Sequence, residues 1–411
     1  MREIRQPASA RSERPFMIIW ETTQACDLAC RHCRAEAQPL HDPMALNTDE
    51  AKMLLDQVDS FGKPRPIFIF TGGDPFKRSD LFELVRYASD LGLPAAVSPS
   101  GTPLLTPANL LRLQEAGAKA ISLSLDGSSP QRHDDFRRVS GSFAWTTNGW
   151  DAARKLGLKV QINTTVTRYN LHDLPEIFRL VLERGAMTWS LFFLVPTGRG
   201  KEEDEISPTE YEAVMNFLYD VDKYISAKPT EGHHFKRVVL QRMILEEKGL
   251  PLEPYMELHP AYYVLKSDLD RIVSEAGLKP RESGIMRTPM HINAGNGFVF
   301  VSVRGKVFPS GFLPLSGGNV RHRSLVDIYR NSALFQDLRD TLKYEGRCGL
   351  CEFVGVCGGS RSRAYAMTGN PLAEEPFCAY QPGSFPFQEE LEQRLAMLKS
   401  NQPRRHAVAD T

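Results

Sequence analysis

The seven cysteines of this chain fall into two groups whose spacing is typical of metal-binding sites. The first group lies within the segment ACDLACRHCRAE and consists of Cys26, Cys30 and Cys33. The second group lies near the C-terminal end and consists of Cys348, Cys351, Cys357 and Cys378. Tetrahedral zinc sites and ordinary iron–sulfur clusters both take four protein ligands. The second group can therefore close a site alone, whereas the first group is one ligand short.

The spacing alone leaves two interpretations of the first group. Zinc would need a fourth ligand such as His32 or a distant residue. On a four-iron cluster, three thiolates would leave one iron without a protein ligand, where a cofactor or substrate can bind. For the second group the alternatives are a structural zinc site and a complete four-iron cluster.

Composition excludes several broad classes of protein. The 411 residues are 42% hydrophobic and 24% charged, and 50 basic residues balance 50 acidic ones, so no general affinity for nucleic acid is expected. We find no secretory signal and no apolar run long enough for a membrane span. Clustered cysteines in an odd number favour metal ligands over disulfides, and we expect a cytoplasmic protein.

Short apolar strands alternate with helical patterns in the first half of the chain. The expected strands are residues 16–23, 66–71, 94–98, 120–125, 159–166 and 187–195. The expected helices are residues 48–61, 79–91, 106–116, 143–156, 171–184 and 207–224. Six such units predict an α/β fold, a partial (β/α)6 parallel barrel, with a doubly wound sheet as the competing arrangement.

The pattern changes after residue 226, and it predicts five regions. We expect a hairpin within residues 297–312 with Arg304-Gly305 at its turn, followed by a helix near residues 324–342. The regions are a flexible N-terminal tail (1–14), the barrel (15–226), a bridge of mixed helix and loop (227–290), a hairpin-plus-helix domain with the second cysteine group (291–383), and a C-terminal helix with a polar tail (384–411).

The first cysteine group resembles the signature C-x3-C-x-Φ-C of the radical S-adenosylmethionine (radical SAM) superfamily, with His32 at the aromatic position Φ. The segment TGGDP after the second expected strand is similar to the Gly-Gly-Glu-Pro motif of that superfamily, with Asp in place of Glu. The resemblance implies a [4Fe-4S] cluster on the three cysteines, with SAM as the missing ligand. The radical SAM core then covers the barrel, residues 15–226.

The resemblance also implies which residues contact SAM. All of them follow expected strands at the carboxyl end, where barrel active sites assemble. A turn or a helix cap would also use these residue types, so each has a structural alternative. The implied cofactor-binding residues are Gly72, Gly73, Asp74, Ser124, Asp126, Asn163 and Arg168.

The C-terminal region resembles the SPASM and twitch extensions of the same superfamily, which carry auxiliary iron–sulfur clusters. Fully equipped SPASM domains bind two auxiliary clusters with additional cysteines. Here Ser310, Asn293 and Arg361 stand near the additional ligand positions. The resemblance therefore implies one auxiliary [4Fe-4S] cluster, bound by the second cysteine group.

The implied reaction begins with reductive cleavage of SAM to a 5′-deoxyadenosyl radical, which abstracts hydrogen from a substrate carbon. It requires a reducing partner of the flavodoxin or ferredoxin type. The auxiliary cluster would accept an electron or hold the substrate. No catalytic residue beyond the cofactor ligands is implied by the sequence.

The layout is similar to radical SAM enzymes of the alternative haem routes, so the favoured substrate is a tetrapyrrole whose propionates are oxidised or decarboxylated. His233 and His234 are candidate iron ligands, Lys236, Arg237 and Arg199 candidate carboxylate partners, and an exposed polar loop is the alternative for residues 230–237. Maturation of a ribosomally made peptide is the second hypothesis. A non-catalytic iron–sulfur or zinc scaffold or redox sensor is the third.

Overall fold

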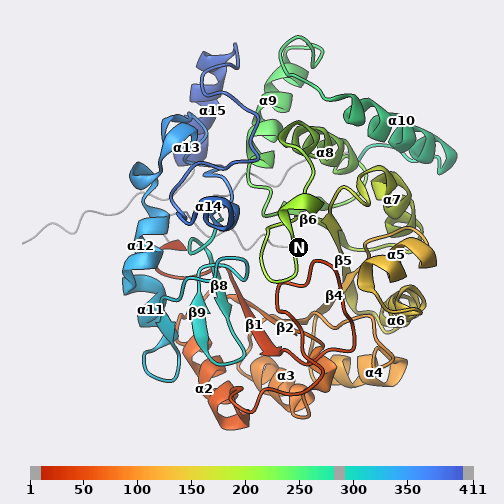
Figure 1. The fold of residues 1–411 in the computed structure, drawn as a ribbon, viewed down its shortest axis with the longest axis vertical. Helices are drawn as coiled ribbons and strands as arrows, with labels where there is room; N and C mark the ends of the chain where they lie inside the picture. Colours follow the sequence, from red (N-terminus) through yellow and green to blue (C-terminus); the bar gives the residue numbers. More distant parts are fainter. Residues whose placement is uncertain (1–10, 282–291, 401–411) are drawn as a thin grey trace, which may run out of the picture.

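One ten-stranded sheet runs through the molecule in the order β10-β9-β8-β1-β2-β3-β4-β5-β6-β7. The structure is a computed structural model that describes residues 11–281 and 292–400 (Figure 1). From β8 to β7 all neighbouring strands pair in parallel, and only β9 and β10 are antiparallel. The strands are β1 Met17–Thr23, β2 Ile67–Gly72, β3 Ala95–Val97, β4 Ala120–Ser124, β5 Lys159–Val166, β6 Thr188–Phe193, β7 Ala227–Thr230, β8 Phe298–Val301, β9 Lys306–Phe308 and β10 Gly318–Asn319.

Helices follow the strands and form an arc on the outside of the curved sheet (Figure 1). The barrel helices are α2 Thr48–Asp59, α3 Leu81–Asp90, α4 Pro107–Glu115, α5 Pro130–Arg137, α6 Ser142–Lys155, α7 Leu174–Glu183 and α8 Pro208–Val221. The later helices are α9 Phe235–Glu247, α10 Pro260–Glu275, α11 Leu325–Asn331, α12 Ala333–Arg339, α13 Gly346–Leu350, α14 Arg361–Thr368 and α15 Gln388–Ser400. The predicted partial parallel barrel with a C-terminal extension is therefore confirmed.

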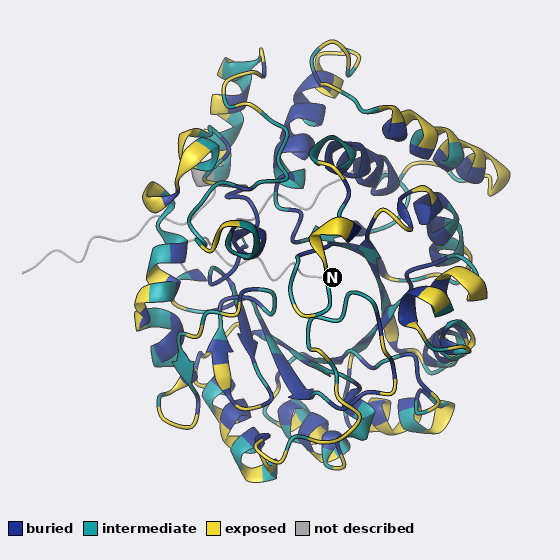
Figure 2. Ribbon diagram, viewed as in Figure 1, coloured by how far each residue is buried: buried dark blue, intermediate teal, exposed yellow. Residues whose placement is uncertain are grey.

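Burial alternates along the barrel strands, which distinguishes a barrel with an open interior from a doubly wound sheet. In β5, Val160, Ile162 and Thr164 are buried, whereas Gln161 and Asn163 are only partly buried. Successive side chains of a strand point to opposite faces. The buried face packs on the helices, as Figure 2 shows. The other face, which carries polar side chains, lines the interior of the barrel.

Four strands extend the sheet beyond the six predicted for the barrel: β7 at one end, and β8, β9 and β10 at the other. β7 pairs with β6, at the start of the predicted bridge, and β8 of the hairpin pairs with β1. The predicted hairpin is present, and Gly305 has a φ of +77° at its turn. The barrel and the hairpin of the C-terminal region therefore share one sheet.

Three further details differ from the expected elements. The helix expected near 324–342 is interrupted at Ser332, whose ψ of 129° is extended, and so forms α11 and α12. The short helix α5 was not predicted, although Ser129 caps its first turn by accepting from the amide of Arg132. The expected bridge contains a well-formed helix, α9, followed by α10.

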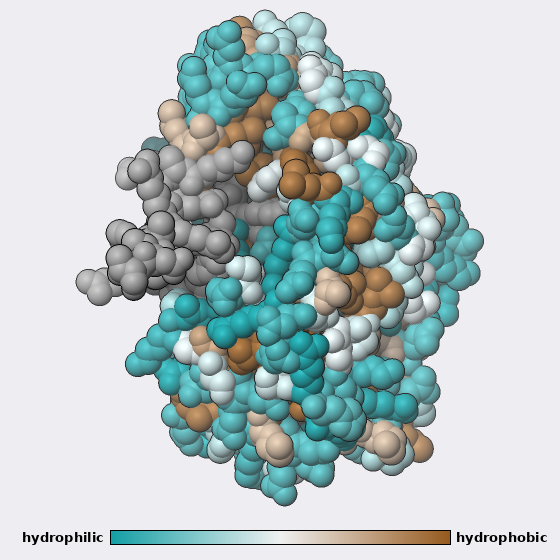
Figure 3. Space-filling model, turned by 90° about the vertical axis from the view of Figure 1, so that its left-hand side faces the viewer, coloured by the Kyte–Doolittle hydropathy of each residue, from teal (hydrophilic) through white to brown (hydrophobic). Residues whose placement is uncertain are grey.

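Most of the predicted tails, residues 1–10 and 401–411, and residues 282–291 lie outside the described residues. Arg11 is buried and its carbonyl accepts a hydrogen bond from the Tyr329 hydroxyl, so the described end of the N-terminal segment is packed on the molecule. Across residues 11–281 and 292–400, no helix has both the length and the apolar composition needed to cross a membrane. On the face shown in Figure 3, hydrophilic residues surround separate, small apolar patches.

Candidate functional site

The loop that follows β1 brings the three cysteines of the first group together at the carboxyl end of the barrel. Cys26 and Cys30 are buried and pack with Leu28, and Cys33 lies against the same small cluster. The Cys26 thiol lies 3.6 Å from the Ser100 hydroxyl, which belongs to the loop after β3. Burial raises the pKa of the Cys26 thiol. Iron would replace the proton on these thiols, because a coordinating thiol is deprotonated by the metal.

The two glycines of TGGDP make room for protein backbone. A Cβ on Gly72 would lie 2.2 Å from the carbonyl oxygen of Thr23, and a Cβ on Gly73 would lie 2.5 Å from that of Ala25. The amide of Gly73 donates to the Thr23 carbonyl at 2.7 Å. These contacts hold the chain directly before Cys26. The space directly beside both glycines is therefore occupied by the backbone of the cysteine loop, which the glycines position.

The side chain of Asp74 forms hydrogen bonds inside the protein. Its carboxylate accepts hydrogen bonds from the Thr102 hydroxyl at 2.7 Å and from the amide of Phe76 at 3.2 Å, and the residue is fully buried. Its amide donates to the Ala25 carbonyl at 2.7 Å. Burial raises the pKa of Asp74 despite these hydrogen bonds. The Asp side chain therefore fixes the turn after β2, and only its backbone remains a candidate for SAM contact.

A second backbone contact holds the other end of the cysteine loop. The segment after β6 contains Gly198, whose φ is +59° and whose Cβ would lie 2.5 Å from the Cys33 carbonyl oxygen. The Arg199 amide donates to the same carbonyl at 3.0 Å, and its Nε donates to the Cys30 carbonyl at 2.9 Å. One terminal nitrogen of Arg199, Nη2, is buried without a partner. That nitrogen remains available to a carboxylate beside the cysteine loop.

Asp126 reaches the cysteine loop through an arginine. It forms a buried ion pair with Arg137, and Arg137 Nη1 lies 3.4 Å from the Cys30 sulfur. Burial alone would raise the pKa of Asp126, but the adjacent Arg137 holds it below the usual value. His32 is the residue at position Φ, and burial lowers its pKa to about 4, so its ring is neutral. The centre of this ring lies 4.7 Å from that of Phe136. Asp126 therefore holds Arg137 beside a cluster thiol.

Ser124 and Asn163 lie opposite each other on adjacent strands, β4 and β5, on the polar interior face. Gln161 donates to the Asn163 side-chain oxygen at 2.8 Å, which fixes the orientation of that amide. By contrast, Arg168 is exposed, with its guanidinium 5.4 Å from the ring centre of Tyr169. Of the polar side chains predicted to bind SAM, Ser124 and Asn163 thus have the position that a ligand inside the barrel requires.

All four cysteines of the second group line one pocket. The pocket is formed by the cysteine-rich segment and by the first turn of α9. Among the described residues, no three His, Cys, Asp or Glu side chains converge closely enough to hold a single metal ion. The four thiols therefore surround a space rather than meet at a point. Burial raises the pKa of Cys351 to about 12 and that of Cys378 to about 11.

Several nitrogen atoms around this pocket have no partner. His234 and Arg237 line it, and both ring nitrogens of His234 and the Nε of Arg237 are buried without a hydrogen bond. The Nη2 of Arg361 lies 3.7 Å from the Cys348 sulfur, and the Nε of Arg361 is also unpaired. Buried polar groups normally have partners. Four thiolates and the sulfides of a [4Fe-4S] cluster would supply negative charge and acceptors, so the lining fits such a cluster.

Segment 230–237 is therefore not the exposed polar loop considered in the sequence analysis. His234 is 1% exposed and Arg237 is 3% exposed. Arg237 forms a buried ion pair with Glu212, and the Nζ of Lys236 donates to the Ile292 carbonyl at 3.1 Å. Burial lowers the pKa of Lys236 to about 8. His234 and Arg237 therefore form part of the wall of the second cysteine site.

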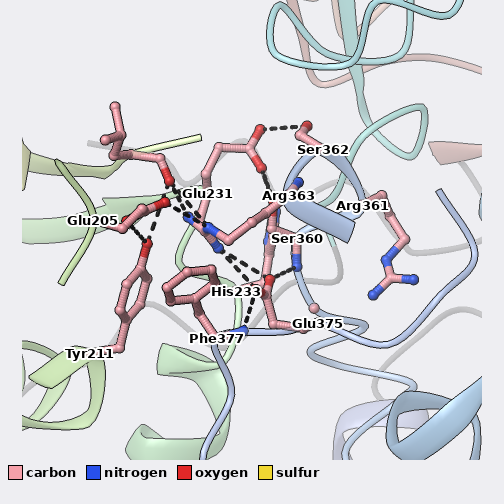
Figure 4. Close-up of polar contacts among 12 residues, drawn as sticks. Glu205, Tyr211, Glu231, His233, Ser360, Arg361, Ser362, Arg363, Glu375 and Phe377 are labelled. Carbon is pink, nitrogen blue, oxygen red and sulfur yellow. Dashed lines mark hydrogen bonds and ion pairs between the residues drawn. The ribbon is translucent and has the colours of Figure 1, made fainter. Parts of the chain in front are cut away.

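A buried ionic network adjoins the second cysteine site (Figure 4). The Arg363 guanidinium lies 3.1 Å from Glu375 and 3.4 Å from Glu205, and it donates to the backbone oxygen of Glu231 at 3.1 Å. Hydroxyl groups surround the Glu231 carboxylate and donate to it, from Ser310, Ser360 and Ser362. The network therefore joins the barrel, the bridge and the C-terminal region.

The residues at the additional SPASM ligand positions take part in structural contacts. The Ser310 hydroxyl donates to Glu231 at 3.0 Å. The Asn293 side chain donates to the Gly359 carbonyl at 2.8 Å, and Arg361 donates to that of Ala373 at 2.6 Å. All three side chains therefore have hydrogen-bond partners within the protein.

Comparison with known proteins agrees with this geometry. A model of the family "Radical SAM superfamily" matches residues 20–181. The AdoMet-dependent heme synthase of Oleidesulfovibrio alaskensis is 42% identical over 374 residues, 90% of this chain and 88% of that protein. This chain belongs to the radical SAM superfamily. It is a radical SAM enzyme and a homologue of heme synthases.

Two further matches support this assignment. The AdoMet-dependent heme synthase of Methanosarcina barkeri is 39% identical over 376 residues, 91% of this chain and 99% of that protein. The solved structure of anSMEcpe with bound AdoMet superposes with a TM-score of 0.61 at 15% identity, covering 94% of this chain and 99% of that one. The radical SAM core therefore carries a C-terminal extension of the type seen in that structure.

Sequence reasoning missed the residues that connect the segments of both sites. Arg137, Glu231 and Arg363 each contact partners far away in the sequence. Nothing in their local spacing differs from ordinary charged positions on helices and loops. One signal was present: the polar run SRSR, residues 360–363, directly after a Gly-Gly pair in a cysteine-rich segment.

Proposed function

We propose that this radical SAM enzyme removes carboxyl groups from the propionate side chains of a tetrapyrrole, converting them to vinyl groups. The observation that carries the proposal is the match over 90% of the chain to heme synthases that depend on AdoMet. In this reaction, hydrogen abstraction from the carbon attached to the ring leaves a carbon radical. Loss of carbon dioxide and one electron then produces the vinyl group.

The first cysteine group would bind a [4Fe-4S] cluster whose open iron is chelated by SAM. Within the barrel we assign Ser124 and Asn163 to the SAM contacts, together with the backbone at Gly72, Gly73 and Asp74. The unpaired Nη2 of Arg199 beside the cysteine loop supports a contact with a carboxylate of SAM or of the substrate.

The second cysteine group would bind one auxiliary [4Fe-4S] cluster, which supplies an acceptor for the electron released in decarboxylation. The pocket lined by four thiols and by unpaired nitrogens supports this assignment. A flavodoxin or a ferredoxin would supply the electron that starts SAM cleavage. All seven cysteines are free, which suits the reducing conditions of the cytoplasm, where we place the enzyme.

The test is an anaerobic assay with reconstituted protein, a strong reductant, SAM and an iron porphyrin that carries propionates. We expect 5′-deoxyadenosine and a porphyrin that has lost carbon dioxide and two hydrogens from a propionate. Cys30→Ala should abolish both products. Formation of 5′-deoxyadenosine without any change in the porphyrin would contradict the proposed substrate.

A further inference from the structure

His234 lies at the second cysteine pocket with neither ring nitrogen satisfied. The residue is 1% exposed, lines the pocket with the four cysteines, and makes no hydrogen bond through Nδ1 or Nε2. A buried polar group left unpaired costs about 1–3 kcal/mol. A partner for this ring is therefore expected, and none of the protein groups around it acts as one.

The neighbours of His234 hold its ring in place but form no hydrogen bond with its two ring nitrogens. Tyr211 stacks on the imidazole, with ring centres 5.7 Å apart and planes at 26°. The Tyr211 hydroxyl donates to Glu205 at 2.6 Å and makes no hydrogen bond to either imidazole nitrogen. His234 also begins α9, where its carbonyl accepts from the amide of Arg237 at 3.0 Å. The stacked ring is thus held in place with its edge available to the group that fills the pocket.

We propose that His234 donates a ring N–H to the auxiliary cluster and thereby raises its reduction potential. This inference rests on the auxiliary cluster proposed above. A hydrogen bond to a cluster sulfur stabilises the reduced form more than the oxidised form, because the reduced form carries one more negative charge. His234 would therefore favour transfer of the electron that leaves the substrate radical when carbon dioxide departs.

In this proposal His234 donates a hydrogen bond and does not coordinate iron. Four thiols already line the pocket, which is the number that a [4Fe-4S] cluster takes. Arg237, one turn further along α9, also lines the pocket with an unpaired Nε, but it is tied to Glu212 by an ion pair. The His234 side chain forms no ion pair or hydrogen bond with the protein, so its substitution tests the contact with the cluster more directly.

The test uses a parent variant, Cys26→Ala with Cys30→Ala and Cys33→Ala, so that the only cluster signal comes from the auxiliary site. In this parent, His234→Phe keeps an aromatic ring against Tyr211 but removes the N–H, and His234→Gln restores a donor. The midpoint potential is measured by a redox titration followed by electron paramagnetic resonance. The exposed His41, in the loop before α2, provides the matched control His41→Phe.

We expect His234→Phe to shift the equilibrium about tenfold towards the oxidised cluster, a potential about 59 mV lower for one electron. His234→Gln should recover most of this shift, and His41→Phe should cause none. Equal potentials in the parent and both His234 variants would overturn the role of His234. If His234→Phe loses its iron, retention of iron in His234→Gln supports the N–H donor, and loss in both overturns it. A parent without iron would instead contradict the auxiliary cluster itself.

Discussion

The two cysteine sites of this enzyme are held in place by different kinds of contact. The first loop is clamped between backbone segments, with Gly73 and Gly198 pressed against the carbonyls of Ala25 and Cys33. The second site is supported by side chains, above all by Arg363 and the carboxylates that surround it. The first arrangement fixes a short loop, whereas the second joins regions far apart in the chain.

This difference has a functional consequence. A loop that must present an open iron to SAM benefits from rigid backbone contacts, to which this structure adds the buried Arg137 beside the Cys30 thiol. A buried cluster that exchanges electrons is sensitive to the charges around it, because these charges set its potential. The first site should therefore respond mainly to changes in size, and the second mainly to changes in charge.

The largest effect is expected for the charge of Arg363. Arg363→Met leaves Glu205 and Glu375 buried without their shared cation, and breaking a buried pair in this way costs about 3–5 kcal/mol. We expect a clear loss of unfolding free energy in denaturant titrations and the loss of auxiliary iron. The matched control is Arg304→Met, since Arg304 pairs with Asp42 at the surface. Equal stability of the two variants would show that the network does not support the second site.

A smaller effect is expected from the protonation of Glu205. Burial, opposed by the charge of Arg363, raises its pKa from the usual 4.5 to about 7. A raised pKa in the folded state means that the contribution to stability is present below pH 4.5 and is lost as the pH rises through about 7. By linkage the shift is worth at most about 3 kcal/mol.

Glu205→Gln removes this titration, so its unfolding free energy should depend less on pH than that of the wild type between pH 4.5 and 7. The measurement is a series of denaturant titrations across this range. Parallel curves for the two proteins would indicate that Glu205 is ionised throughout and that the carboxylates share their charge differently.

The smallest cost in stability is expected at the first site, with a selective loss of activity. Gly73→Ala places a methyl group 2.5 Å from the Ala25 oxygen, and such overpacking costs about 1–3 kcal/mol. The displaced loop should cleave SAM at least about tenfold more slowly, equivalent to 1.4 kcal/mol in the barrier. Auxiliary iron should be unchanged. Gly355→Ala is the control for SAM cleavage, because a Cβ at Gly355 meets no atom within 4 Å and Gly355 does not have a positive φ. Normal SAM cleavage in Gly73→Ala would refute the backbone clamp.

The sequence predicted local features well and distant contacts poorly. The repeated strand and helix patterns predicted the six barrel units, and Gly305 marked the hairpin turn. The short strand β7, AKPT, was missed because Pro is rare within strands and Pro229 lies here on the edge of the sheet. Its pairing with β6 depends on tertiary structure that a sequence pattern does not contain.

The same limit applies to the candidate sites. Cysteine spacing predicted two groups, and each group is brought together in the structure. The ion pair between Asp126 and Arg137, a residue on the following helix, was not predicted. His234 was a candidate ligand of a porphyrin iron, with an exposed loop as the alternative, and neither hypothesis placed it at the second pocket, which it lines. Which face of a helix meets which loop depends on packing between elements, and spacing along the chain does not report it.

The central claim is that this chain binds two independent four-iron clusters, and metal analysis of reciprocal variants tests it most directly. Reconstituted wild-type protein should contain about eight irons per chain and no zinc. The variant that lacks Cys26, Cys30 and Cys33, and the variant that lacks Cys348, Cys351, Cys357 and Cys378, should each retain about four. Zinc in either site, or the loss of all iron from either variant, would contradict the account.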